Sequence, residues 1–270
     1  MNKKMIISQN NKLIKHIKAL QIKKNRRLHK QFIIEGIRGV EECLLHDVPI
    51  VYLLYTEDLE EVPRGLDILQ DLVKKYESYK VSKEVFMKLS DTESPQGILA
   101  VVNIPHTPLD TISIDENALI VVLDRIQDPG NMGTIIRTAE AVGANTIIIN
   151  KGCVDPYNSK TVRATMGALL HIPIVEVNNN EEWVSLLKES NVTIIGSSLD
   201  TDKSYLDMDY KGKVAIVIGN EANGIDEKLL PILDVSVKIP IVGKIESLNA
   251  SIAAALLMYK ASEHKFPTKV

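Results

Sequence analysis

The apolar residues in the second half of the chain fall in short uninterrupted runs, separated by longer segments of mixed polarity. The clearest run is Ala-Leu-Ile-Val-Val-Leu at 118–123, and further strands are predicted at 146–149, 174–177, 192–195, 214–218 and 235–239. A continuous apolar run is typical of a strand buried on both faces of a parallel sheet. Helices are predicted between and after these strands, at 130–142, 181–188, 227–233 and 247–263. This alternation predicts an α/β fold with a mostly parallel sheet.

The first half of the chain repeats the alternation on a smaller scale. Leu13, Ile17, Leu20 and Lys24 have helical spacing, which predicts one helix over 10–27. Strands are predicted at 32–34, 48–55, 79–81 and 97–102, and further helices at 37–44, 65–75 and 83–89. Residues 104–108 contain two prolines and are typical of a linker. We therefore expect a small α/β domain at 1–105, a linker at 106–117 and a larger α/β domain at 118–270.

Charge separates a basic N-terminal segment from an acidic remainder. The first 40 residues hold eleven Lys and Arg, including Lys3 and Lys4, and one acidic residue, Glu35; the whole chain holds 32 basic and 35 acidic residues. Such asymmetry indicates a polyanionic partner such as nucleic acid, although a charge run is also typical of a solvated helix. The candidate RNA-binding residues are Lys12, Lys15, Lys23, Lys24, Arg26, Arg27, Lys30 and Arg38.

Several functional classes are disfavoured by missing patterns. No apolar stretch approaches the roughly 18 residues of a membrane span, and the N-terminus has no apolar core of a secretory signal. Cys43 and Cys153 form no CxxC pair and the histidines have no metal-ligand spacing, so we expect a reduced, cytoplasmic protein without a metal. The glycines form neither a dinucleotide-binding motif nor a P-loop, which disfavours a nicotinamide-dependent enzyme and an NTPase.

Polar residues cluster in two blocks at predicted strand ends. The first block, 124–139, has the sequence Asp-Arg-Ile-Gln-Asp-Pro-Gly-Asn-Met-Gly-Thr-Ile-Ile-Arg-Thr-Ala. The second combines Gly219-Asn220-Glu221, Pro240-Ile241-Val242-Gly243 and Ser247-Leu248-Asn249. Parallel α/β sheets bind ligands through the loops at the carboxyl ends of their strands. Taken singly, these residues are also typical of turns, helix caps and helix-dipole partners.

In this order and spacing, the blocks resemble the three signature motifs of the SpoU (TrmH-like) branch of the SPOUT superfamily, over about residues 118–264. The resemblance implies 2′-O-methylation of RNA ribose with S-adenosyl-L-methionine as cofactor. It also implies a sheet with a trefoil knot and a homodimer formed through the catalytic domain. Two N-terminal segments, 32–36 and 89–98, resemble the RNA substrate-binding domain attached to many bacterial ribosomal-RNA members of this branch.

The resemblance assigns catalytic roles to Asn131, Arg137, Glu221, Ser247 and Asn249. Glu221 would orient Arg137 and Asn131. Since a guanidinium is normally protonated, Arg137 would either assist deprotonation of the 2′-hydroxyl or bind phosphate bidentately and lower the hydroxyl pKa through its charge. The residues expected to hold the cofactor are Ser197, Ser198, Leu199, Gly219, Asn220, Ile239 and Leu248.

The full N-terminal domain favours 23S ribosomal RNA as the target, with guanosine as the methylated nucleoside. Transfer-RNA members of the branch typically have only small helical extensions, but a transfer-RNA target stays open as an alternative. An alternative of another class is a non-catalytic RNA-binding or ribosome-assembly factor on the same scaffold. The complete set of polar motif residues argues against that alternative.

Overall fold

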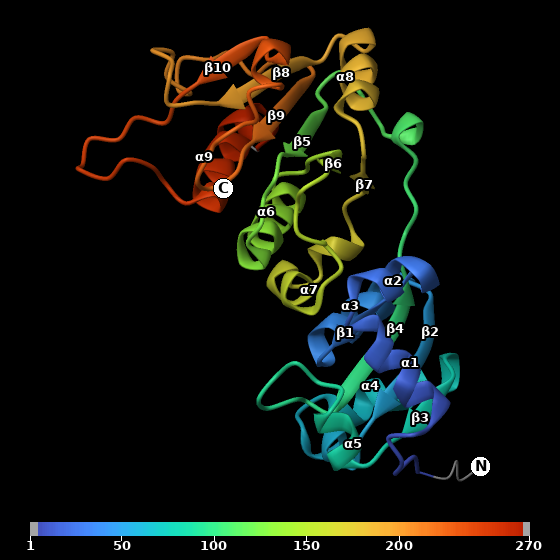
Figure 1. Ribbon diagram of the computed structural model, residues 1–270. Coiled ribbons are helices and arrows are strands. Elements are labelled where there is room, and N and C mark those ends of the chain that lie inside the picture. The colour runs from blue at the N-terminus through green and yellow to red at the C-terminus, as the bar shows by residue number, and fades with distance from the viewer. Residues whose placement is uncertain (1–4, 267–270) are drawn as a thin grey trace. The chain divides into compact units, whose positions relative to one another are not determined.

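The computed structural model describes residues 5–266, which form two compact units (Figure 1). The N-terminal unit comprises the described residues up to Pro105 together with Asp155–Leu170. The C-terminal unit comprises His106–Val154 and the described residues from His171 onward. Lys3 and Lys4 of the basic segment lie outside the described residues. The segment Asp155–Leu170 thus packs with the N-terminal unit, although in sequence it lies within 118–270.

The C-terminal unit is built on a six-stranded parallel sheet with the order β10-β8-β9-β5-β6-β7. Its strands are β5 (Leu119–Leu123), β6 (Thr146–Ile149), β7 (Ile174–Glu176), β8 (Thr193–Ser197), β9 (Val214–Ile218) and β10 (Val235–Val237). Its helices are α6 (Pro129–Ala141), α8 (Asn180–Glu189) and α9 (Ala250–Ser262). Every residue of β5 and β9 is buried, which confirms the parallel sheet predicted from the apolar runs.

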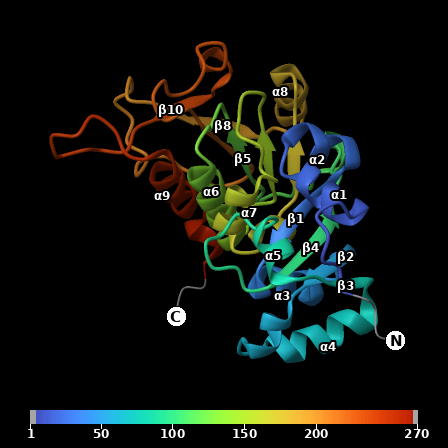
Figure 2. The ribbon, with the colours of Figure 1, turned by 60° about the horizontal axis from the view of Figure 1, so that its bottom comes forward.

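Helices cover both faces of this sheet. On one face, Ile120 and Val122 of β5 pack in a core with Trp183 and Leu187 of α8. The alternate residues of β5 point to the opposite face, where α6 and α9 lie side by side (Figures 1 and 2). Because all six strands run in one direction, their carboxyl ends lie at one edge of the sheet, and the polar blocks follow these ends.

The N-terminal unit has a mixed four-stranded sheet with the order β1-β4-β2-β3. Its strands are β1 (Gln31–Glu35), β2 (Ile50–Tyr55), β3 (Ser78–Lys80) and β4 (Ile98–Asn103). Its helices are α1 (Lys12–Leu20), α2 (Lys23–His29), α3 (Ile37–Leu45), α4 (Gly65–Lys75), α5 (Lys83–Met87) and α7 (Ser159–Thr165). The apolar face of α1 (Ile14, Ile17 and Leu20) packs in a core with Phe86 of α5 and Leu99 of β4.

The single helix predicted over 10–27 is wrong, because the chain breaks into α1 and α2 at Gln21 and Ile22. Ile22 has extended backbone angles and precedes the first residue of α2. The guanidinium of Arg26 explains the break: its Nη1 donates to the carbonyl oxygens of Leu20 and Gln21, both at 2.8 Å. A cation at a helix C-terminus satisfies carbonyl groups that have no partner within the helix.

Two further predictions differ from the structure. The helix predicted over 227–233 is only a 3-10 turn at Leu230–Ile232, because Pro231 has no backbone N–H to donate in a longer helix. Helix α7 was not predicted, because its sequence, Ser-Lys-Thr-Val-Arg-Ala-Thr, has no apolar periodicity. Asn158 caps α7 by accepting a hydrogen bond from the Thr161 N–H at 3.0 Å.

A buried ion pair fixes the segment Asp155–Leu170 to the rest of the N-terminal unit. The Arg26 Nε and Nη2 atoms donate to Asp155 Oδ2 at 2.9 and 2.6 Å, and Arg26 is only 5% exposed. The other carboxylate oxygen of Asp155 accepts from the Tyr157 N–H at 3.0 Å, and the Tyr157 ring packs against Phe32 of β1 in a tilted arrangement with 5.0 Å between centroids. Arg26 was expected to contact RNA, but its guanidinium is buried and donates four hydrogen bonds inside the protein.

We predict that Asp155→Ala lowers the free energy of unfolding of the N-terminal unit by about 3–5 kcal/mol, because the substitution leaves the Arg26 charge buried without its counter-ion. Urea unfolding followed by circular dichroism measures the loss. The exposed Lys24→Ala is the control and is expected to change stability by less than about 0.5 kcal/mol. The double variant Arg26→Met/Asp155→Leu should recover much of the loss. Equal stability of Asp155→Ala and the wild type would contradict a structural role for the pair.

Candidate active site

The carboxyl end of β5 is tied to the loop after β9 by a buried carboxylate. Asp124, 3% exposed, accepts hydrogen bonds at Oδ2 from Arg125 (Nε at 3.2 Å and Nη2 at 3.1 Å) and from the Asp226 N–H (2.8 Å). Arg125 also donates to the Gly224 carbonyl at 3.2 Å. Asp124 is not among the predicted site residues. Its position directly after a buried strand, followed by an arginine, was the available signal.

Helix α6 begins directly after this junction. Asp128 is its N-cap and accepts from the Asn131 N–H at 2.7 Å, while Pro129 occupies the first helical position. Proline is favoured there because the missing N–H would have no partner within the helix. The cap places the Asn131 side chain in the first turn of α6, at the edge of the sheet where β5 and β9 end.

Asn131 lies at the centre of a hydrogen-bonded chain formed by three of the five predicted catalytic residues. Its Nδ2 donates to Glu221 Oε1 at 2.8 Å, and its Oδ1 accepts from Asn249 Nδ2 at 2.9 Å. An ionised carboxylate only accepts hydrogen bonds. Glu221 therefore fixes the orientation of the Asn131 amide. In that orientation the Asn131 carbonyl oxygen faces Asn249 and accepts its hydrogen bond. Three loops that are far apart in the sequence are joined by these two bonds.

Asn249 is also the N-cap of α9. Its Oδ1 accepts from the Ser251 N–H at 2.9 Å and from Ser251 Oγ at 2.6 Å. The capping interpretation and the active-site interpretation of Asn249 are therefore compatible, since each uses a different atom of the amide. Of the two residues considered as caps, Asn249 occupies the position and Ser247 does not.

Arg137 and Ser247 are not part of this chain of bonds. Arg137 is exposed on α6, about 9 Å along the helix axis from Asn131, and it makes no hydrogen bond or ion pair within residues 5–266. Glu221 was expected to orient Arg137 as well as Asn131; its second oxygen instead lies 3.4 Å from Asn220 Nδ2. Ser247 is exposed in the loop before α9.

The expected cofactor residues lie at the carboxyl ends of three neighbouring strands and at the start of α9. Strands β10, β8 and β9 are adjacent, and the loops after β8 and β10 are joined by a bond from the Ser198 N–H to the Val237 carbonyl at 2.9 Å. The residues at this edge are Ser197 at the end of β8, Ser198 and Leu199 after it, Gly219 and Asn220 after β9, Ile239 after β10, and Leu248 before α9.

Gly219 and Asn220 shape the loop after β9. A Cβ atom at position 219 would lie 2.2 Å from the carbonyl carbon of Gly224, so the returning turn requires a glycine here. Asn220 Oδ1 accepts from the backbone of Ala222 and Asn223 at 3.0 and 3.1 Å, and its Nδ2 donates to the Arg125 carbonyl at 2.9 Å. Both residues thus hold Glu221 in place through the backbone.

Seven of the eight predicted RNA-binding residues are exposed on the N-terminal unit. They are Lys12, Lys15, Lys23, Lys24, Arg27, Lys30 and Arg38. Arg26 is the exception, because its guanidinium is buried against Asp155.

Close to the candidate active site, Cys153 donates to the Leu123 carbonyl at 3.4 Å, and burial raises the pKa of its thiol to about 11. At neutral pH this thiol stays protonated and is not a nucleophile.

Both parts of the chain match known protein families. Residues 118–259 match the SpoU rRNA Methylase family, and residues 11–100 match the MRM3-like substrate binding domain. The chain is 35% identical to the 23S rRNA (guanosine(2553)-2′-O)-methyltransferase RlmP of Bacillus subtilis, covering 95% of this chain and 98% of that protein. It is 30% identical to the 23S rRNA (uridine(2479)-2′-O)-methyltransferase of Streptomyces viridochromogenes, covering 94% and 91%.

A solved structure supports the same assignment. The AdoMet-bound rRNA methyltransferase from Sinorhizobium meliloti superimposes with a TM-score of 0.88 at 32% identity, covering 98% of this chain and 99% of that one. The similarity therefore extends over both units and includes the motif residues at the edge of the parallel sheet. The chain belongs to the SpoU rRNA methylase family and carries an N-terminal substrate-binding domain of the MRM3-like type.

Proposed function

We propose that this protein transfers a methyl group from S-adenosyl-L-methionine to the 2′-hydroxyl of a ribose in 23S ribosomal RNA, with guanosine as the methylated nucleoside. The two curated relatives named above are both 23S rRNA 2′-O-methyltransferases, and the one with the higher identity acts on a guanosine. The related Sinorhizobium meliloti structure contains AdoMet. A ribosomal substrate also supports a cytoplasmic location. Within residues 5–266, no helix has the length and apolarity needed to cross a bilayer.

The observation that carries this proposal is the bonded chain Asn249–Asn131–Glu221. Each residue comes from a different motif, and each has its amide or carboxylate orientation fixed by a neighbour. Orienting groups before the substrate arrives is the main way in which an enzyme can place two reactants in line. The alternative, a non-catalytic RNA-binding factor, gives no chemical role to three groups of separate motifs oriented together at this edge.

The residues at the ends of β8, β9 and β10 fit an adenosine-containing cofactor. Leu199 is 63% exposed, and Ile239 and Leu248 are half-buried, so apolar side chains remain outside the core at the proposed site. Together with the backbone of Ser197 and Ser198, they can enclose an adenine without placing a protein charge beside a sulfonium. When bound, the cofactor would supply the electrophilic methyl group.

The protein's own contribution is to hold and activate the acceptor hydroxyl. The Arg137 guanidinium, which has no partner in the part of the chain that the structure describes, can bind an RNA phosphate through two parallel hydrogen bonds. Its positive charge then favours the ionised form of a nearby 2′-hydroxyl, and the alternative role, direct assistance in proton removal, uses the same position. Asn131, held by Glu221, and Ser247 and Asn249 at the start of α9 would contact the ribose. The exposed basic residues of α1 and α2 would bind phosphates, with the strong salt dependence typical of such contacts.

The outer face of α9 supports a homodimer. Ile252, Leu256 and Tyr259 are 51%, 37% and 50% exposed, and their spacing puts them on one side of the helix. A continuous apolar stripe of this kind is typical of a protein interface. We therefore propose that α9 packs against a second copy of the chain. The family assignment also supports a trefoil knot in the C-terminal unit.

The function is tested by cofactor binding and by mapping of RNA methylation. We expect isothermal titration to show binding of S-adenosyl-L-methionine, and we expect cells without this gene to lose one 2′-O-methyl group from 23S rRNA. Loss of a methyl group from transfer RNA instead would overturn the ribosomal target. Absence of cofactor binding would favour the non-catalytic alternative.

We predict that Arg137→Ala and Arg137→Lys both reduce methyl transfer by about a hundredfold or more, within the range observed when a group that stabilises transition-state charge is removed. Lysine is included because its ammonium lacks the planar fork of the guanidinium. Incorporation of a labelled methyl group into 23S rRNA measures the effect. Thermal unfolding should be unchanged, since Arg137 is exposed. Near-normal turnover in either variant would exclude the proposed role.

Two substitutions separate the roles of Asn249. Asn249→Ala removes both the cap and the bond to Asn131, and we expect it to cost about 1 kcal/mol of stability as well as activity. Asn249→Ser keeps a good capping residue, but its side chain is too short to reach Asn131, so stability should stay close to wild type while methyl transfer falls at least about tenfold. Full activity of Asn249→Ser would show that the bond to Asn131 is not needed.

We predict that Leu256→Glu converts the protein to a monomer, because it puts a charge in the centre of the apolar stripe on α9. Size-exclusion chromatography with light scattering gives the mass. Leu45→Glu, which changes an exposed leucine of the N-terminal unit, is the matched control and should leave the mass unchanged. A wild-type protein that is monomeric at micromolar concentration would remove the basis for the dimer.

A further inference from the structure

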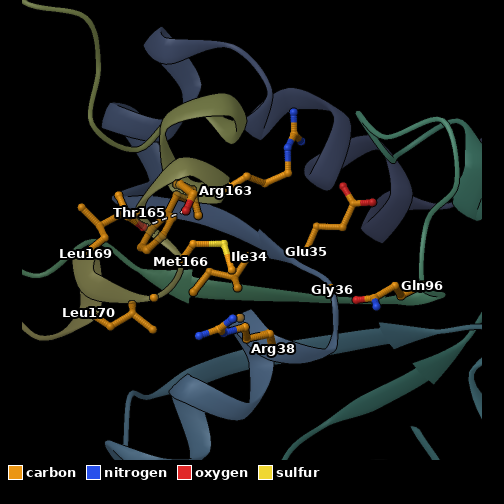
Figure 3. A pocket seen from close by; sticks show the side chains of 14 residues that line it. Ile34, Glu35, Gly36, Arg38, Gln96, Arg163, Thr165, Met166, Leu169 and Leu170 are labelled. Carbon is orange, nitrogen blue, oxygen red and sulfur yellow. Dashed lines mark hydrogen bonds between the residues drawn. The ribbon is translucent and has the colours of Figure 1, made fainter. Parts of the chain in front are cut away.

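The N-terminal unit contains a cavity of about 200 Å³ that the proposed methyl-transfer chemistry does not use (Figure 3). Two segments distant in sequence form its walls. Strand β1 and the start of α3 contribute one side, and the segment from α7 to Leu170 contributes the other. The first segment falls in the substrate-binding match and the second in the methylase match, so the cavity exists only when the two are packed together.

The interior of the cavity is apolar. Ile34 of β1 and Leu169 are buried, and Leu170 and Met166 complete the wall (Figure 3). A typical drug-sized site encloses about 300–1,000 Å³, so this smaller cavity suits a single flat ring system. The mouth is polar, because Arg38, Gln96 and Glu35 also line the cavity.

Met166 has a backbone conformation that suggests a role for its side chain. It occupies the left-handed region at φ 53°, as the C-cap of α7, where glycine is the favoured residue and a longer side chain is strained. The chain nevertheless has methionine here and glycine only at the following position. The Met166 thioether lies beside Ile34 in the cavity wall (Figure 3), and the residue remains 40% exposed. A polarisable sulfur of this kind packs well on an aromatic ring.

Two hydrogen-bond donors that line the cavity, from Arg38 and Gln96, have no acceptor among residues 5–266. Arg38 is exposed, and its guanidinium makes no hydrogen bond or ion pair in the described part of the chain. The Gln96 Oε1 accepts from the Ile37 N–H at 2.9 Å, which leaves its Nε2 to donate elsewhere. Arg163 Nη1 is also buried without an acceptor among the described residues, but its guanidinium points away from Met166 and Arg38 (Figure 3) and is not one of these donors. By contrast, Glu35 is occupied by Ser90 and by Thr92 Oγ1.

We propose that this cavity receives one unstacked nucleobase of the RNA substrate, at a nucleotide other than the one that is methylated. The base would lie between Met166 and the apolar wall, and Arg38 and Gln96 would donate to the acceptor atoms of its edge or to the adjoining phosphate. The inference rests on the proposed function, since it assumes that the substrate is RNA.

The charge around the cavity favours RNA over other occupants. Sequence-specific proteins read RNA mainly through unpaired bases that are turned out of the stack and held by stacking and edge hydrogen bonds. The mouth offers donors and a free guanidinium, which match the carbonyl and ring-nitrogen acceptors of a base and the phosphate beside it. An apolar peptide side chain would leave these donors without a partner. Arg38 is also one of the seven exposed basic residues of the N-terminal unit.

The test uses the full-length protein, with protein-free 23S rRNA from cells lacking this gene as the probe. Arg38→Ala and Met166→Gly are the cavity variants, and Lys74→Ala, which removes an exposed charge on α4, is the matched control. We expect each cavity variant to raise the KM for RNA about tenfold, which corresponds to roughly 1.4 kcal/mol, without changing kcat or the KM for S-adenosyl-L-methionine. Met166→Gly should fold as well as the wild type, because glycine adopts the left-handed conformation without strain.

Chemical probing of the bound RNA supplies a second measurement. With wild-type protein, dimethyl sulfate or a ribose-reactive reagent should reveal one nucleotide, away from the methylated ribose, whose reactivity changes on binding; that change should disappear with Arg38→Ala. Kinetic constants of both cavity variants equal to those of Lys74→Ala would overturn the cavity proposal and leave the methyltransferase proposal standing. A wild-type protein that methylates no RNA would overturn both.

Discussion

The parallel arrangement of six strands, with β5, β6 and β9 fully buried, is the constraint from which the rest of the C-terminal unit follows. Because all strands run in one direction, every loop that follows a carboxyl end lies at the same edge of the sheet. Residues near 131, 221 and 249 can therefore meet although about 120 positions separate the first from the last. Burial of the strands on both faces leaves these loops as the part of the sheet edge where polar side chains can gather.

Several residues at this edge combine a structural role with a proposed chemical one. Asn249 caps α9 with its carbonyl oxygen and reaches Asn131 with its nitrogen. Gly219 and Asn220 form the turn that presents Glu221. The buried Asp124 joins two of the loops, so the position of the proposed catalytic groups depends on a residue that touches none of them. In such a site, the same hydrogen bonds that cap a helix or close a turn also hold the polar side chains in their orientation before a substrate binds.

The N-terminal unit shows how a buried charge pair can define a boundary between domains. The Arg26–Asp155 pair attaches residues 155–170 to the N-terminal unit, and the same guanidinium ends α1 by binding its last carbonyl groups. The strand β6 thus leads into a segment that contacts β1, and the chain returns from that segment to β7. RNA bound beside Met166 would contact residues 155–170. This segment is continuous in the chain with strands β6 and β7 of the parallel sheet.

The sequence by itself determined the class of fold, the strands and most helices, because buried strands and amphipathic helices leave periodic apolar patterns that depend only on neighbouring residues. It also determined the family, because the motif residues near 131, 219–221 and 247–249 keep a fixed order and spacing. The break between α1 and α2, the helix α7 and the burial of Arg26 were decided only in the tertiary structure. The burial of Arg26 depends on Asp155 and the helix α7 on β1, both far away in the chain, and the guanidinium that Asp155 holds in place in turn ends α1. Local propensity contains no information about such a partner, and a lysine- and arginine-rich stretch has the same pattern whether one of its cations faces solvent or a buried carboxylate.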